Sequence, residues 1–329
     1  GYFKFAADYP DRNKTYELTG VTGADWLWST GDQPLVANLG YGSKNIYFTV
    51  RPGTEGNAVI AARDDAGNIV WSWHIWMTTE DPLTPTHYTR GNTWLLTDRN
   101  LGATSNVQGD AASYGLYYQW GRKDPFPGVN TAGSNAESSE SAQFSGSTQA
   151  FVINDAFSGH TFKSVRNSAM GGDDLAFVTA NPTTFVYQQG ATGTNTWAYN
   201  LTADELAALW NSATDKSKKT IYDPCPAGYC VPVNNSYAWQ NWTAGLVAFE
   251  PSLSGVVYSN GAGNTSYYPA AGYRKSGQAS NVGYTCAYWA ANMKSGTITP
   301  YTMWCYNRSS LGNSAQPTQY GLPVRCMKQ

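Results

Sequence analysis

The chain has 329 residues, of which 41% are hydrophobic, 14% aromatic and only 13% charged, and its formal net charge is −2. No basic run is longer than Lys216–Lys219, which excludes nucleic acid as a partner, because that affinity depends on clustered Lys and Arg. No apolar run approaches the roughly 20 residues that span a bilayer, so we expect no transmembrane segment. The length predicts two domains, and many aromatics with few charges are typical of an extracellular, β-rich protein.

Residues 1–80 are predicted to form a small, immunoglobulin-like β-sandwich. Strands are expected at Asn45–Val50 and Asn57–Ala62, and Asp64–Asn68 between strands predicts a hairpin turn, because Gly and Asn tolerate positive φ. The returning strand, Ile69–Met77, is apolar on both faces, which favours a central position in the sandwich. We interpret His74 in this strand as a satisfied structural residue and not as a ligand.

A polar segment with two prolines, Glu80–Thr86, predicts a linker after this domain. We place the linker at residues 81–87 and a second domain at residues 88–329. Gly1 opens directly onto a strand-like sequence, so we expect that an export or lipoprotein signal has been removed, with lipid anchoring through that segment left open.

The second domain is predicted to be α+β with little helix. Residues 130–149 are almost entirely small and polar, so they are expected to form an exposed, mobile insert. Thr202-Ala-Asp-Glu205 is a capping box, and the apolar residues that follow it predict a helix over Ala203–Asn211. Short strands are expected at Gly245–Phe249, Gly255–Tyr258, Ser266–Pro269, Cys286–Trp289 and Met303–Tyr306.

Four separated motifs rich in Gly, Pro and aromatic residues stand out: Trp94–Ala103, Gly115–Gly128, Asp223-Pro-Cys-Pro-Ala-Gly-Tyr229 and Gly321-Leu-Pro-Val-Arg-Cys326. Together they resemble the C-terminal modules of surface and fimbrial tip proteins in gut Bacteroidetes, which are related to the "major paralogous domain" of Fibrobacter. The resemblance implies a C-type-lectin-like fold after the sandwich, an extracellular or outer-membrane location, and adhesion at a cell surface. It departs from the family at Cys230, where arginine is usual, and at Ala290-Ala291, where serines are usual.

The five cysteines all lie in the last third of the chain. The resemblance implies a disulfide between Cys225 and Cys326 that staples the two ends of the module. Cys286 and Cys305 are a second candidate pair, which would leave Cys230 as the odd thiol, although pairing of Cys230 with either of them stays open. The three histidines are remote from the cysteines in sequence, so no zinc site, other metal site or cofactor is expected.

Exposed aromatic residues are the candidate ligand-binding groups. The set comprises Tyr117, Tyr118, Trp120, Arg122, Trp239, Trp242 and Trp289. Aromatic and cationic side chains can stack on a sugar ring and bind its hydroxyls, and Trp239-Gln-Asn-Trp242 suits this use because it places two indoles in a polar loop. The alternative for each is a place in the core, and for Tyr117–Arg122 we favour that structural role.

No nucleophile–base pair or metal-binding motif is visible, so no catalytic residue is expected and the chain is predicted not to be an enzyme. The adjacent carboxylates Asp204 and Glu205 are explained by their place in a first helical turn. In the first motif, Asp98 or Asn100 is expected to cap a turn while Arg99 pairs with a carboxylate; a ligand site there is the alternative. The predicted partners are a glycan or a host or bacterial surface protein, together with other pilus subunits. The rival functions are a polysaccharide-binding or polysaccharide-processing surface protein and a structural pilus subunit without a ligand.

Overall fold

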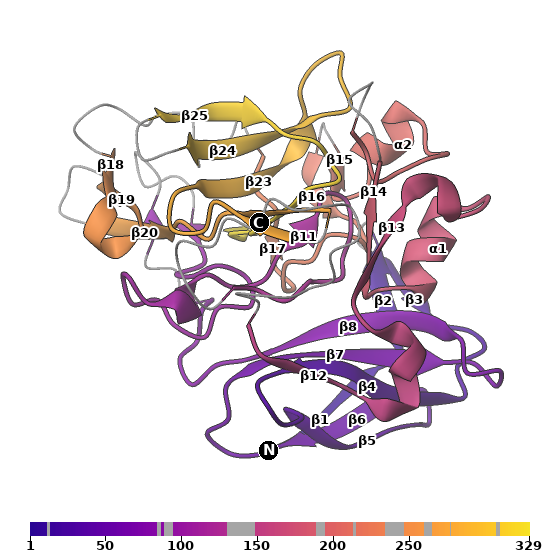
Figure 1. Ribbon diagram of the computed structural model, residues 1–329. Coiled ribbons are helices and arrows are strands. Elements are labelled where there is room, and N and C mark those ends of the chain that lie inside the picture. The colour runs from indigo at the N-terminus through magenta and orange to yellow at the C-terminus, as the bar shows by residue number, and fades with distance from the viewer. Residues whose placement is uncertain are drawn as a thin grey trace.

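The computed structural model describes residues 1–11, 14–83, 87–88, 95–129, 149–188, 195–212, 215–233, 247–259, 265–276, 278–306 and 310–329. Within them the chain forms several small, mostly antiparallel sheets and a few short helices (Figure 1). The expected mainly β, α+β class is confirmed at this level.

Two sheets build the N-terminal part. One has the order β1 (Tyr2–Ala6), β6 (Asn45–Val50), β5 (Val36–Gly42), and the other has the order β12 (Phe151–Ile153), β4 (Gly23–Thr30), β7 (Gly56–Arg63), β8 (Ile69–Met77), with β2 (Asp8–Asp11) and β3 (Lys14–Glu17) as a separate hairpin. Phe48 of the first sheet and Ile60 of the second share one hydrophobic cluster. The predicted turn between β7 and β8 is confirmed, since the Asp64 carboxylate accepts from the Asn68 main-chain N at 2.8 Å and Gly67 has a φ of +82°.

The strand order corrects one prediction. β8 is an edge strand of its sheet, and the central position beside it belongs to β7. Along β7, Ile60 belongs to the cluster between the two N-terminal sheets, whereas Val59 belongs to the cluster shared with the second part of the chain. Both faces of this sheet are therefore covered, so even its edge strand has apolar residues on both faces.

The two parts of the chain are joined by more than the segment between them. β12, which follows residue 149, pairs antiparallel with β4 and sets Val152 opposite Ser29. The main hydrophobic cluster combines Leu27 and Trp28 of β4 with Trp120 and other residues of the second part. The division of the chain into two domains at residues 81–87 stays a prediction. Both the pairing of β12 with β4 and the main hydrophobic cluster connect residues that lie on either side of this boundary.

Small sheets make up the second part, with β23–β25 at the top of Figure 1 and β18–β20 at its left. Two four-stranded sheets have the orders β17 (Tyr229–Cys230), β27 (Met327–Lys328), β10 (Leu95–Leu96), β9 (His87–Tyr88) and β11 (Tyr118–Gln119), β26 (Gly321–Leu322), β21 (Tyr273–Lys275), β22 (Gln278–Ser280). Two three-stranded sheets have the orders β23 (Cys286–Met293), β24 (Pro300–Tyr306), β25 (Ser310–Ala315) and β18 (Val247–Glu250), β19 (Gly255–Ser259), β20 (Thr265–Pro269). Two further sheets are the pairs β13 (Lys163–Arg166) with β14 (Thr184–Tyr187) and β15 (Asn211–Ser212) with β16 (Asp215–Lys219). Of the predicted insert, residues 130–148 lie outside the described residues.

Helices are short. The α-helices are α1 (Asp174–Ala180) and α2 (Ala203–Ala207), and 3₁₀ turns occur at Ala111–Ser113, Asp155–His160, Asn167–Ala169 and Pro251–Leu253. The capping box of α2 is present, with the Thr202 hydroxyl accepting from the Glu205 N at 3.3 Å and the Glu205 carboxylate accepting from the Thr202 N at 2.9 Å. The prediction that this helix reaches Asn211 is wrong. The chain leaves the helix because the Trp210 indole donates to the Arg122 carbonyl at 3.2 Å and β15 begins at Asn211.

The expected disulfide between Cys225 and Cys326 is present and closes a separation of 101 residues. It lies next to the pairing of β17 with β27, so it joins the middle of the second part to its C-terminal segment. The second candidate bridge is not formed: Cys286 and Cys305 face each other across β23 and β24 as buried thiols without a disulfide, and Cys230 is likewise buried and not disulfide-bonded. Burial raises the pKa of the Cys286 thiol, and its hydrogen bond with Cys305 adds to the rise, whereas the same hydrogen bond lowers the pKa of Cys305.

Candidate functional site

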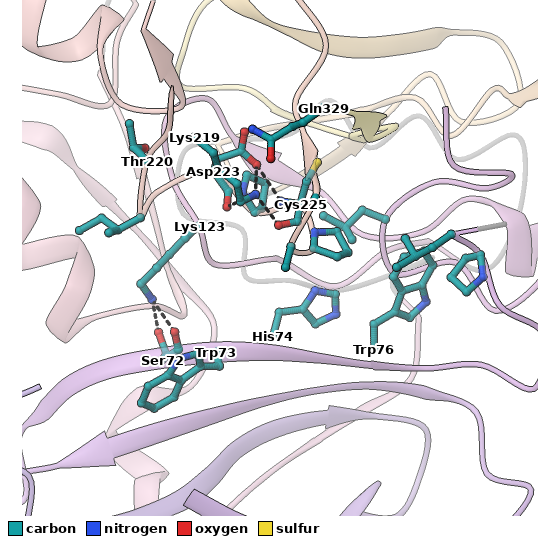
Figure 2. A pocket seen from close by; sticks show the side chains of 18 of the residues that line it. Ser72, Trp73, His74, Trp76, Lys123, Lys219, Thr220, Asp223, Cys225 and Gln329 are labelled. Atoms are coloured by element: carbon teal, nitrogen blue, oxygen red, sulfur yellow. Dashed lines mark hydrogen bonds and ion pairs between the residues drawn. The ribbon is translucent and has the colours of Figure 1, made fainter. Parts of the chain in front are cut away.

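A cleft of about 650 Å³ lies between β8 and the segment Lys219–Gly228 (Figure 2). This volume is in the range of sites for small molecules. Further lining residues come from residues 81–83 and from Gln329 in the C-terminal segment. The cleft therefore brings together the N-terminal sheet, the predicted linker and the motif around the disulfide.

The edge of β8 forms one wall of this cleft. Consecutive residues from Trp71 to His74, and then Trp76, line it. Successive side chains of a strand point to opposite faces of the sheet. Residues from both faces of β8 can therefore border the same cavity only where it runs along the edge of the strand. In agreement, the main-chain carbonyl of Ser72 accepts a hydrogen bond from Lys123 Nζ at 3.1 Å, outside the sheet. The edge position of β8 is thus what opens the cleft.

Indole rings supply the apolar surface of this wall. Trp76 is half-buried and donates its indole N–H to the Ala103 carbonyl at 2.9 Å. Trp73 is half-buried and makes an edge contact with Phe5, with ring centroids 5.3 Å apart. The indole N–H of Trp76 is therefore already used, and its ring borders the cleft. The Trp73 ring instead packs on the opposite face of β8, against the cluster between the N-terminal sheets, so Trp73 borders the cleft only along the strand edge.

His74 points from β8 into the region between the walls (Figure 2), yet both of its ring nitrogens have partners. Nε2 lies 2.9 Å from Asn57 Oδ1, and Nδ1 lies 3.1 Å from the Tyr118 hydroxyl. Since the Asn57 oxygen can only accept, Nε2 holds the proton and Nδ1 accepts from Tyr118. Burial lowers the pKa of His74 from 6.5 to about 3. The ring is neutral, and the interpretation of His74 as a satisfied strand residue is confirmed.

Lys123 closes one end of the cleft but its charge is already paired. Its Nζ donates to the Ser72 hydroxyl and lies 2.8 and 2.9 Å from the two carboxylate oxygens of Asp124. The same ammonium lies 4.4 Å from the ring centre of Trp71, in a cation–π contact. Burial lowers the pKa of Lys123, while Asp124 opposes the shift. The pair is a neutral, desolvated unit in the wall.

The opposite wall contains a second pair of the same kind. Lys219 Nζ lies 2.6 Å from Asp223 Oδ1, and it also donates to the Asp223 and Cys225 carbonyls. The Asp223 carboxylate further accepts from the main-chain N–H of Cys225 and of Val231, both at 2.9 Å. Asp223 thus organises the turn of the Asp-Pro-Cys-Pro motif, and the disulfide at Cys225 anchors it.

Five of the predicted ligand-binding residues lie in the core. They are Tyr117, Tyr118, Trp120, Arg122 and Trp289, each at most 2% exposed. Side chains with so little exposure offer no surface to a ligand, so their positions correct the expectation that they bind one directly. The two remaining predicted residues, Trp239 and Trp242, lie outside the described residues.

The buried residues of the Tyr117–Arg122 motif connect separate parts of the second module. The Trp120 indole donates to the Ala290 carbonyl at 2.8 Å, and the Trp289 indole donates to the Tyr118 carbonyl at 2.7 Å. Arg122 lies over the Phe126 ring at 5.2 Å, and burial lowers its pKa to about 10. These contacts bear out the structural role that we favoured for this motif.

The first motif also has a structural role. Arg99 forms an ion pair with Asp98 at 2.7 Å and a longer one with Glu80 at 3.5 Å, so the expected carboxylate partner is present. Buried Arg325 donates to the Asn100 side-chain oxygen at 3.0 and 3.1 Å. This network joins the first motif to the closing one.

Sequence reasoning missed the tryptophans of β8 as candidate site residues. Trp71, Trp73 and Trp76 were visible within a predicted strand, but apolar residues on both faces favoured a fully enclosed strand. The sequence contains no signal that would have identified them, because their proximity to the charged Asp-Pro-Cys-Pro motif is revealed only by the tertiary structure.

Few ionisable side chains line the cleft. Asp81 and Asp223 are the acidic residues among its described lining, and Asp223 is fully engaged in the turn. Among the described residues, no group of three or more His, Cys, Asp or Glu side chains could hold a metal ion. No helix in the described ranges is long and apolar enough to cross a membrane.

Comparisons with protein-family models, curated proteins and solved structures found no match.

Proposed function

We propose that this protein is a cell-surface adhesion protein, a fimbrial tip or related surface subunit, that binds a glycan or a protein segment in the cleft beside β8. The observation that supports this most is the cleft itself, a concave site of about 650 Å³ with indole surface from Trp76 and polar groups at its margin. Aromatic anchors surrounded by polar groups are typical of recognition sites.

Two further features support a setting outside the cell. The disulfide between Cys225 and Cys326 is of the kind that persists in oxidising compartments. The scarcity of charge and abundance of aromatics agree with the resemblance of the four motifs to surface adhesins of Bacteroidetes, including their lectin-like module. On this proposal the protein is extracellular or attached to the outer membrane, with other pilus subunits as assembly partners.

A polysaccharide-processing enzyme is the rival that the cleft favours less. Glycoside hydrolysis uses two carboxyl groups on either side of the scissile bond. Of the two acidic residues in the described lining, Asp223 accepts hydrogen bonds from Lys219, Cys225 and Val231. A carboxylate so completely bonded within a turn is poorly placed to act as an acid or nucleophile.

Adherence of protein-coated beads to epithelial cells tests the proposal. We expect wild-type protein to mediate adherence, and Trp76→Ala to reduce it severely because the variant removes the aromatic surface of the cleft. Tyr199→Ala is the matched control, since Tyr199 is 59% exposed and does not line the cleft. Equal adherence of Trp76→Ala and wild type would refute the role of the cleft. Immunogold labelling of the native organism with antibody to residues 88–329 tests the setting, and gold at fibre tips is the expected result.

A further inference from the structure

Charge in the cleft wall discriminates between classes of glycan. Lys123 and Lys219 are the cationic residues in its described lining, and an acidic sugar would need one of them as a partner. An ammonium group has three N–H donors. Whether these donors are still available therefore decides which glycans the cleft can bind.

The donors of Lys123 are already used. Its Nζ meets four acceptors: the Ser72 carbonyl at 3.1 Å, the Ser72 hydroxyl, and both oxygens of Asp124 at 2.8 and 2.9 Å. The side chains of Lys123 and Asp124 are 9% and 6% exposed, so the ion pair is closed off from solvent. Moving Lys123 toward a ligand would leave the carboxylate of Asp124 buried and uncompensated, which is costly.

The N–H donors of Lys219, on the opposite wall, are also already used. Its Nζ has three acceptors, namely Asp223 Oδ1 at 2.6 Å, the Asp223 carbonyl at 3.2 Å and the Cys225 carbonyl. Its side chain is 15% exposed and that of Asp223 is fully buried. The remaining acidic residue of the described lining, Asp81, is exposed at the margin. The cleft thus presents the indole surface of Trp76, without an available cation in its described lining.

The geometry points to a neutral glycan, one without carboxylate, sulfate or phosphate groups, as the ligand of this cleft; the inference rests on the proposed adhesive function. The C–H face of a neutral sugar ring packs on the indole of Trp76, and its hydroxyls hydrogen-bond at the polar margin. An acidic group would lose its hydration without gaining an ion pair.

A printed glycan array on which each neutral oligosaccharide is matched with its sialylated, uronic-acid or sulfated counterpart tests the inference. We expect wild-type protein to bind neutral members, and the added acidic group to weaken binding at least tenfold. For the strongest neutral probe, raising NaCl from 0.05 to 0.5 M should change Kd by less than about twofold, because no ion pair is formed with the ligand. Trp76→Ala should weaken binding about tenfold or more, whereas Tyr199→Ala should leave it unchanged. Trp76→Phe is a second variant with a milder change in volume, and it should weaken binding at least threefold.

The outcomes separate this inference from the proposed function. Binding that requires an acidic group, or that falls steeply with salt, would overturn neutral selectivity but leave adhesion standing. If the protein binds no glycan on the array but still adheres to cells, and this adherence depends on Trp76, the cleft takes a protein segment. This outcome also overturns the inference alone. Absence of both array binding and adherence by folded wild-type protein would refute the proposed function together with the inference.

Discussion

Removal of the disulfide should have the largest effect on stability of any change that leaves the strands intact. The bridge joins Cys225 to Cys326 across 101 residues. In the loop-entropy treatment, a closed loop of this length raises the free energy of unfolding by about 4.7 kcal/mol at 25 °C, because the crosslink restricts the unfolded chain. The perturbation is the double substitution Cys225→Ala with Cys326→Ala.

The measurement is urea unfolding followed by tryptophan fluorescence, for both proteins, with and without a phosphine reductant. Wild type should lose about 3–5 kcal/mol on reduction, while the double variant should be unaffected because Cys230, Cys286 and Cys305 are not disulfide-bonded. Comparison of the two proteins under reducing conditions isolates the cost of truncating two buried side chains, Cys225 at 5% and Cys326 at 0% exposure.

Thiol titration under denaturing conditions provides the control. Wild type without reductant should show three reactive thiols and reduced wild type five, as the five cysteines and the single described bridge require. If the titration shows that the bridge is reduced and the free energy of unfolding still falls by less than about 1 kcal/mol, the entropic reasoning is refuted for this protein.

Three further changes test other parts of the structure. Burial lowers the pKa of His74 from 6.5 to about 3, so the unfolded state takes up the proton first and stability is lost as the pH falls from 6.5 toward 3. At pH 5 the free energy of unfolding should have fallen by about 2 kcal/mol. Unfolding curves of wild type and His74→Gln at pH 8 and pH 5 measure this loss, and parallel pH profiles of the two proteins would contradict the assignment. Gly272→Ala should lower the free energy of unfolding by at least about 2 kcal/mol, because φ is +68° and an added Cβ would lie 2.2 Å from the Ser280 carbonyl oxygen. Gly171→Ala is the control: φ is +88° but nothing lies within 4 Å of its added Cβ, so the loss should be only about 1 kcal/mol. Equal losses would show that the close contact is unimportant. Thr202→Ala should lower the free energy of unfolding by about 1 kcal/mol through loss of the α2 cap, and a change below about 0.3 kcal/mol in urea unfolding would mean that the first turn of α2 is held by its tertiary contacts alone.

Local patterns determined much of this protein from the sequence alone. Strand-like runs of residues predicted β6 and β8, and the Gly/Asn turn predicted the hairpin between β7 and β8, because these features depend on neighbouring residues. The capping box predicted the start of α2 for the same reason. The resemblance of the motifs to a known family implied the Cys225–Cys326 pair, whereas spacing alone left several pairings open.

Tertiary structure decided where these elements lie, and therefore where the cleft is. Apolar residues on both faces of β8 fit a central strand and an edge strand covered by a second layer equally well, and only the packing of the second part distinguishes them. The same ambiguity applies to Trp120 and Trp289, since an indole suits both a core and a sugar. Their burial depends on carbonyl partners more than 150 residues away along the chain. The pairing of Lys123 and Lys219, which governs the choice of ligand, likewise follows from burial that no local pattern encodes.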